Sequence, residues 1–120
     1  MSTESKMNKT PEKENNDQTC NSFHGAIEFI GKRWMGMIIY RLLDGPKRYH
    51  ELLEEIQGIS DRLLTERLRE LVRHGLVNKY VSPGKTRKVE YELTDSGELK
   101  EIMHAIVKWV EKNSDNEDKY

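Results

Sequence analysis

The sequence has very little cysteine and no long apolar run. Cys20 is the only cysteine among 120 residues, which excludes an intrachain disulfide framework and a zinc site built from paired cysteines. The apolar run MGMIIY at residues 35–40 is far too short to cross a bilayer, and the first residues contain no apolar signal core. We therefore expect a cytoplasmic protein that does not contact the membrane.

Apolar residues are scarce as well, at 35% of the chain, whereas charged residues make up 34%. They are also unevenly distributed, because residues 1–19 contain no aliphatic or aromatic residue apart from methionine. Such a segment cannot bury enough apolar surface to offset the entropy lost on ordering. We expect a disordered tail at residues 1–19, one folded domain at residues 20–112 and a flexible tail at residues 113–120.

The histidines show no metal-binding or catalytic pattern. His24, His50, His74 and His104 are far apart in the sequence, and no HExxH motif occurs. No serine or cysteine has an identifiable general base. We therefore expect no enzyme activity, no metal and no cofactor, and a metal-responsive regulator or an enzyme is a distant alternative.

The spacing of the apolar residues predicts a mainly helical fold. Four segments carry apolar side chains three or four residues apart, as on one face of a helix, and each ends near a glycine, Gly31, Gly45, Gly58 or Gly75. The residues of these four stripes are Phe23, Ile27 and Ile30; Trp34, Met37, Ile38 and Leu42; Tyr49, Leu52, Leu53 and Ile56; and Leu64, Leu68 and Leu71.

The third and fourth predicted helices are separated by only a few residues. Ser60 is a favourable N-cap for the fourth helix, and Asp61 in its first turn suits the positive end of the helix dipole. Two helices joined by a short turn that contains glycine form a helix-turn-helix.

After Gly75 the apolar period changes from helical to alternating. Residues 76–81 and 88–94 alternate side chains as a half-buried hairpin does, with Val77, Val81, Val89, Tyr91 and Leu93 on the apolar side. Residues 82–87, SPGKTR, form the turn between them. Thr94 is then expected to cap a last helix, whose apolar residues are Leu99, Ile102, Met103, Ile106, Trp109 and Val110.

The fourth predicted helix has a polar face that suits DNA. Each residue turns about 100° around the axis, so Arg62, Glu66 and Arg69 lie nearly opposite the leucines. Ser60 and Thr65 lie in the N-terminal half, where a recognition helix usually touches base edges. Arginine can bind guanine through two hydrogen bonds, and hydroxyls reach phosphates or bases. A solvated surface helix is the alternative.

Two further groups of cations are candidate DNA contacts. Lys85 and Arg87 lie at the tip of the predicted hairpin, with Lys88 beside them, and would contact phosphates or the minor groove; the alternative is an ordinary soluble turn. Lys47 and Arg48, near the start of the third helix, would touch the DNA backbone or simply be exposed.

The first and last predicted helices have more apolar surface than one small core needs. A broad apolar stripe on a terminal helix is what a symmetric dimer would bury, although part of it belongs to the core. The candidate interface residues are Phe23, Ile27, Ile102, Ile106 and Trp109, and Trp109 is the best anchor because indole supplies a large area.

Several ordered motifs resemble one family, the HxlR-type winged-helix regulators, which are relatives of the MarR-like group. They are IGKRW at 30–34, RYHELL at 48–53, GISDRLLTERLREL at 58–71 followed by HGLVNK, and VEYELTDSG at 89–97. The resemblance implies a winged helix-turn-helix and a homodimer formed by terminal helices, with the fourth helix in the major groove and a hairpin wing beside it. It also implies that some relatives sense through a cysteine placed like Cys20, although this chain has Cys20-Asn21 where the family commonly has Cys-Pro.

Together these observations predict a transcriptional regulator that binds double-stranded DNA. We expect a homodimer on a pseudo-palindromic operator. Cys20 is a candidate sensor of oxidants or electrophiles because it directly precedes the first helix, and the alternative is an inert cysteine beside the tail. The alternative is a winged-helix adaptor that binds proteins and not DNA.

Overall fold

A computed structural model describes residues 21–84, 88–94 and 98–113. The chain divides into two compact units, residues 1–35 and residues 36–120. Cys20, Lys85 and Arg87 lie outside the described residues, as do the expected tail at residues 1–19 and all but the first residue of the expected tail at residues 113–120. The predictions made for these residues are therefore untested by the fold.

In the first unit a helix occupies residues 21–30, as the apolar spacing predicts. It ends at Gly31, whose N–H donates to the carbonyl of Ile27 at 2.7 Å. A β-carbon on Gly31 would lie only 2.9 Å from that same oxygen, so glycine allows this tight ending. Trp34 has a φ of 72°, a left-handed conformation that L residues rarely adopt. The expectation that Trp34 belongs to the second helix is wrong, because this turn separates it from the helix.

The next helix is α2 (Met35–Leu42), which belongs to the second unit apart from its first residue. Ile38, Ile39 and Leu42 are fully or almost fully buried, whereas Met37 is 43% exposed. Met37 therefore does not belong to the buried stripe predicted for this helix. The reason is helical geometry, since Met37 points away from the side that Ile38 and Leu42 share.

The predicted helix-turn-helix is confirmed in α3 (Tyr49–Glu55) and α4 (Asp61–Arg73). The Ser60 hydroxyl accepts the N–H of Leu63 at 3.1 Å and so caps α4. The chain leaves α4 through Gly75, which has a φ of 74° and suits the left-handed conformation of a helix stop. Three leucines of α4 form its buried seam, Leu64, Leu68 and Leu71.

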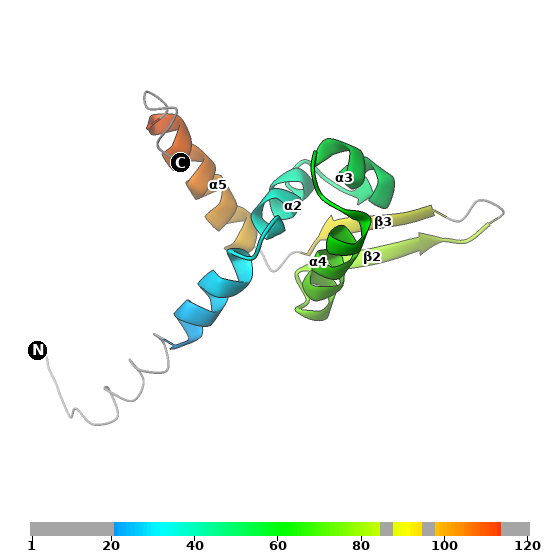
Figure 1. Cartoon of the computed structure of the whole chain (residues 1–120), viewed down its shortest axis with the longest axis horizontal. Helices are drawn as coiled ribbons and strands as arrows, with labels where there is room; N and C mark the ends of the chain where they lie inside the picture. Colours follow the sequence, from blue (N-terminus) through cyan, green and yellow to red (C-terminus); the bar gives the residue numbers. More distant parts are fainter. Residues whose placement is uncertain (1–20, 85–87, 95–97, 114–120) are drawn as a thin grey trace, which may run out of the picture. The chain divides into compact units, whose positions relative to one another are not determined.

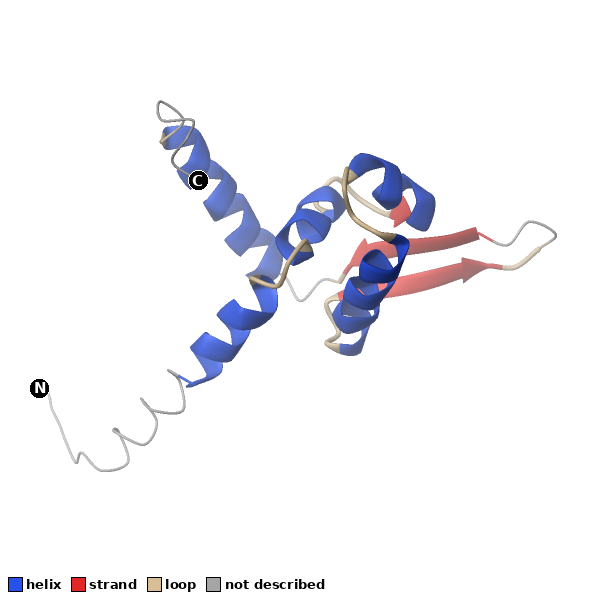
Figure 2. Cartoon of the chain, in the orientation of Figure 1, coloured by secondary structure: helices blue, strands red, loops and turns tan. Residues whose placement is uncertain are grey.

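A three-stranded antiparallel sheet combines a short strand that precedes α3 with the hairpin that follows α4. It contains β1 (Lys47–Arg48), β2 (Val77–Ser82) and β3 (Lys88–Leu93) in the order β1-β3-β2, and Val77 is paired with Leu93. Figure 2 shows the strands in red beside the helices in blue. The hairpin was predicted, but β1 was not. It pairs Lys47 with Tyr91.

The helix-turn-helix covers one part of this sheet. In the second unit α4 packs against β2, and α3 packs against β1 and β3. Figure 1 shows that the ends of β2 and β3 nearest residues 85–87 extend beyond these helices. Val81 is accordingly 44% exposed, contrary to the expectation that it lies on a buried face.

The last helix is α5 (Glu98–Lys112), of which only Met103 is buried. The Thr94 hydroxyl donates to the carbonyl of Gly75 at 2.9 Å, and the expected cap falls next to residues 95–97, which are not described. No helix within residues 21–84, 88–94 and 98–113 is long and apolar enough to span a membrane. The architecture is mainly helical with a β-hairpin, as predicted.

Candidate nucleic-acid interface

The outward face of α4 carries the predicted DNA-binding residues together. Arg62, Glu66 and Arg69 are exposed on the side opposite the buried leucines. The Arg62 side chain is 90% exposed, and its Nε lies 3.3 Å from Oε1 of Glu66. An ion pair this exposed contributes little to stability. Its effect is to orient Arg62 with Nε toward Glu66.

Tyr49 links the start of α3 to the start of α4. Its hydroxyl lies 2.7 Å from Oδ1 of Asp61, 3.0 Å from the Asp61 carbonyl and 3.1 Å from the hydroxyl of Thr65. The pKa of Tyr49 is raised, first by burial and then by hydrogen bonding to Asp61 and by its charge, although the bond to Thr65 opposes the shift. The phenol therefore keeps its proton at neutral pH and can donate it.

These residues border a surface hollow of about 520 Å³ beside the N-terminal half of α4, lined by Tyr49, Asp61, Arg62, Thr65, Glu66 and Arg69. Sequence reasoning placed Arg62, Thr65, Glu66 and Arg69 here but missed Tyr49 and Asp61. Tyr49 was assigned to an apolar stripe, and its hydrogen-bonding partners are distant in the sequence. The only signal available was a hydroxyl on an otherwise apolar helix face.

A second hollow of about 400 Å³ lies between the C-terminal half of α4 and the hairpin. It is lined by Thr65, Leu68, Arg69, Val72, Arg73, Lys79 and Tyr91. Arg69, Arg73 and Lys79 give it three cations, and all three are exposed. Sequence reasoning missed Lys79, because a lone lysine in a strand carries no distinguishing pattern.

Other cations near α3 and α4 are held by carboxylates. Nζ of Lys47 lies 3.1 Å from Oε2 of Glu55, and Nη1 of Arg67 lies 2.8 Å from Oε1 of Glu70. The Lys47 and Arg67 side chains are only 16% and 15% exposed. The Lys47–Glu55 pair joins β1 to the end of α3, whereas the Arg67–Glu70 pair lies within α4. The outward face is formed by other arginines of α4, which are exposed.

Arg48 lies in β1 and is half-buried. Its backbone N–H donates to Oε1 of Glu51 at 2.7 Å, which closes the first turn of α3. The pKa of Glu51 is lowered chiefly by this hydrogen bond. Beyond the hairpin turn, Lys88 is exposed at the start of β3, while Lys85 and Arg87 lie outside the described residues.

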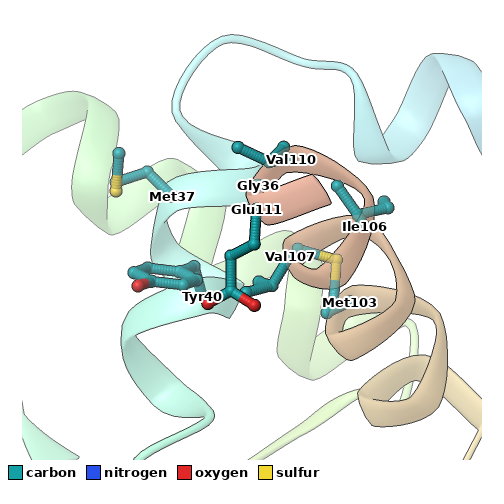
Figure 3. A pocket seen from close by; sticks show the side chains of 8 residues that line it. All are labelled: Gly36, Met37, Tyr40, Met103, Ile106, Val107, Val110 and Glu111. Atoms are coloured by element: carbon teal, nitrogen blue, oxygen red, sulfur yellow. The ribbon is translucent and has the colours of Figure 1, made fainter. Parts of the chain in front are cut away.

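The candidate dimer residues are apolar side chains of both units. In the first unit Phe23 and Ile27 are 66% and 51% exposed. In the second unit Ile102, Ile106 and Trp109 are exposed on α5. An apolar groove of about 430 Å³ lies beside them between α2 and α5, lined by Gly36, Met37, Tyr40, Met103, Ile106, Val107, Val110 and Glu111. Figure 3 shows these side chains around the groove.

A model of the HxlR-like helix-turn-helix matches residues 29–118. The chain belongs to the HxlR-like helix-turn-helix family. The matched range contains the helix-turn-helix, the hairpin and α5. Proteins of this family are transcriptional regulators, so this HxlR-like chain is a DNA-binding regulator and not an enzyme.

Relatives in Bacillus subtilis are similar over most of their length. The chain is 40% identical over 93 residues to the HTH-type transcriptional regulator YodB, covering 77% of this chain and 83% of YodB. It is 38% identical over 96 residues to the uncharacterized HTH-type regulator YvaP, covering 79% of this chain and 89% of YvaP.

Solved structures agree with the HxlR-like fold. The redox regulator HypR in its reduced form is 35% identical, with a TM-score of 0.73, and the match covers 82% of this chain and 99% of HypR. The reduced form of YodB from Bacillus subtilis is 39% identical, with a TM-score of 0.68, covering 76% of this chain and 90% of that chain. The predicted winged helix-turn-helix is therefore confirmed.

Proposed function

We propose that this HxlR-like regulator acts in the cytoplasm as a homodimer, with one α4 from each subunit in the major groove of a pseudo-palindromic operator. The observation that carries the proposal is the pair of adjoining hollows along α4. One contains hydrogen-bonding groups beside the N-terminal half of the helix, and the other contains Arg69, Arg73 and Lys79.

The side chains along α4 and the hairpin differ in the groups of DNA that they can bind. Arg62 and Arg69 carry donors that can bind guanine O6 and N7, and Ser60 and Thr65 lie at the end of α4 that usually meets base edges. Arg73 and Lys79 are candidates for phosphate contacts, which give affinity without sequence choice. Lys85 and Arg87 extend the same role to the tip of the wing, while Arg48 is a backbone contact beside α3.

A homodimer accounts for the apolar side chains that remain exposed. Phe23 and Ile27 in the first unit, and Ile102, Ile106 and Trp109 on α5, would each be removed from water by a second copy. Burial of apolar area stabilises association by about 25 cal/mol per Å² before the entropic costs of binding. Two recognition helices related by a two-fold axis would then fit half-sites roughly 34–36 Å apart, or a multiple of that distance.

Cys20 is the proposed sensor of oxidants or electrophiles in this regulator. Structures exist of HypR in reduced and oxidized forms and of YodB in reduced and diamide-treated forms. In this chain Cys20 directly precedes the helix at residues 21–30, and helix N-termini lower the pKa of a thiol. Oxidation of one thiol in each subunit could then change operator affinity.

DNA binding can be tested with duplexes from the region upstream of the protein's own reading frame. Footprinting should show protection of two related half-sites, and fluorescence anisotropy should show affinity that falls linearly with log salt. Protection of a single unrepeated site would contradict the dimeric arrangement. Absence of any salt-dependent binding would instead favour the alternative, a winged-helix adaptor that binds proteins.

A further inference from the structure

The hydroxyl of Tyr49 occupies an unusual place, since it touches two residues of the helix that is proposed to read DNA. It lies within hydrogen-bonding distance of the Asp61 carboxylate and carbonyl and of the Thr65 hydroxyl. Asp61 and Thr65 lie one turn apart on α4 and border the same hollow as Arg62 and Arg69. Tyr49 therefore contacts two side chains of the proposed reading surface, although it does not lie on α4 itself.

The directions of these hydrogen bonds follow from counting protons. A phenol has one proton to give. The Asp61 carboxylate and carbonyl oxygens can only accept, and the 2.7 Å contact to the carboxylate is the shortest of the three. The Tyr49 proton therefore goes to Asp61, and charge assistance strengthens this bond.

The remaining bond must then run the other way. With its proton committed to Asp61, the Tyr49 oxygen can only accept from Thr65 at 3.1 Å. The single hydroxyl proton of Thr65 is thereby directed inward, toward Tyr49. Thr65 can then offer a ligand only the lone pairs on its oxygen, as an acceptor. The nearby Asp61 carboxylate is also an acceptor.

A base edge that meets this surface must therefore supply a donor. In the major groove adenine N6 and cytosine N4 are amino groups that donate, whereas guanine O6 and thymine O4 are keto oxygens that accept. From this geometry we infer that Tyr49 is a positioning residue for base specificity, which holds the Thr65 hydroxyl as an acceptor and so selects an adenine or cytosine over a guanine or thymine at one position of each half-site. This inference rests on the proposed binding of α4 in the major groove.

The test measures base preference and not only affinity. Dissociation constants would be determined by fluorescence anisotropy for full-length protein on duplexes carrying each base at every position of the half-sites. In the wild-type protein, one symmetric position should bind roughly tenfold more weakly with guanine or thymine than with adenine or cytosine. In Tyr49→Phe the same ratio should fall to about threefold or less, because Thr65 can then turn its proton toward a keto oxygen.

Variants of Thr65 keep the inference falsifiable if Tyr49→Phe folds poorly. Thr65→Val should lose the preference, and Thr65→Ser should retain it because the hydroxyl remains. Tyr40→Phe is the matched control, since it removes a phenol hydroxyl from α2, which borders neither hollow along α4, and should leave the base preference unchanged. Thermal unfolding of each variant would confirm that it is folded.

Two outcomes would overturn the inference, and they are distinguishable. If Tyr49→Phe and Thr65→Val both show the base preferences of the wild type at every position, Tyr49 does not set specificity, although the regulator still binds DNA as proposed. If the wild-type protein binds none of the duplexes, the proposed function fails and this inference fails with it.

Discussion

At the scale of single residues, the position of a cation determines what it can do for DNA binding. Arg69 is exposed on the outward face of α4 and borders both hollows, whereas Lys79 is an exposed residue on β2. Lys47 and Arg67 carry the same charge but are held at short distances by Glu55 and Glu70. Charge alone therefore does not identify the reading residues.

Replacing Arg69 and Lys79 should have different consequences. Arg69→Ala should cost about 1–3 kcal/mol on the best operator and relax specificity at one base pair, because a bidentate contact to guanine is lost. Lys79→Ala should weaken all sequences alike and reduce the slope of log affinity against log salt by about one. Salt titrations on specific and scrambled duplexes check both. Equal effects of Arg69→Ala on both duplexes would contradict a reading role.

Cys20 should make the operator affinity of this protein sensitive to oxidants. Treatment with diamide should change the operator affinity of the wild-type protein and leave that of Cys20→Ser unchanged, because the serine hydroxyl cannot form a disulfide or a thiol adduct. Anisotropy before and after treatment measures the response, and mass spectrometry shows whether the thiol is modified. Identical responses of the two proteins would exclude sensing by Cys20.

At the scale of helices and strands, the start of each helix in the helix-turn-helix is fixed by a specific polar contact. Ser60 caps α4 with its side chain, and Glu51 accepts the backbone N–H that precedes α3. Each contact stabilises the first turn of its own helix. Their removal should therefore be visible in stability measurements.

Ser60→Ala should lower the free energy of unfolding by about 1 kcal/mol, because the N–H of Leu63 loses its acceptor. Ser60→Asn should recover most of this loss, since asparagine is also a good N-cap. Urea denaturation at a fixed protein concentration measures both, with Ser82→Ala on β2 as the control for losing an exposed hydroxyl. A loss for Ser82→Ala as large as that for Ser60→Ala would contradict the capping role.

The stability that Glu51 contributes to the folded protein should depend on pH. Its pKa in the folded protein lies below the ordinary value of 4.5, chiefly because its carboxylate accepts the N–H of Arg48. A lowered pKa stabilises the folded state above that ordinary value, and the contribution is lost as pH falls through the folded pKa. Glu51→Gln should therefore be less stable than the wild type at pH 7, and the difference should shrink below pH 4.5.

The matched control for this experiment is Glu54→Gln, which changes an exposed glutamate on the same helix. It should lower stability less than Glu51→Gln at pH 7. Urea denaturation across the acid range gives both curves. A constant difference between Glu51→Gln and the wild type at all pH values would show that the lost stability does not come from the charged hydrogen bond.

At the scale of the whole molecule, dimerisation should be the property most sensitive to α5. Trp109→Ala should cost about 2 kcal/mol or more of dimer stability, because large aromatic anchors dominate interfaces, and operator affinity should fall with it. Sedimentation at several concentrations measures the dimer. Lys108→Ala, at an exposed position beside it, should have little effect. A wild-type monomer that still binds the operator tightly would rule out this arrangement.

The sequence predicted the helix-turn-helix well because periodic leucines and a good cap are local signals. It misplaced Trp34 because a left-handed turn leaves no trace in apolar spacing, and it missed β1 because two residues are too few to alternate. At the interface, the arginines of α4 were predictable from the helical period. Tyr49 was not, since its partners Asp61 and Thr65 come close only in the folded chain.

The short strand β1 has a mechanical consequence. Lys47 and Arg48 directly precede α3 and pair with Tyr91 and Glu90 in β3, which is itself one arm of the wing. The sheet therefore joins the start of α3 to the hairpin through backbone pairing. We expect that a DNA groove that displaces the hairpin also displaces α3, so that operator affinity depends on the width and bending of the groove as well as on its bases.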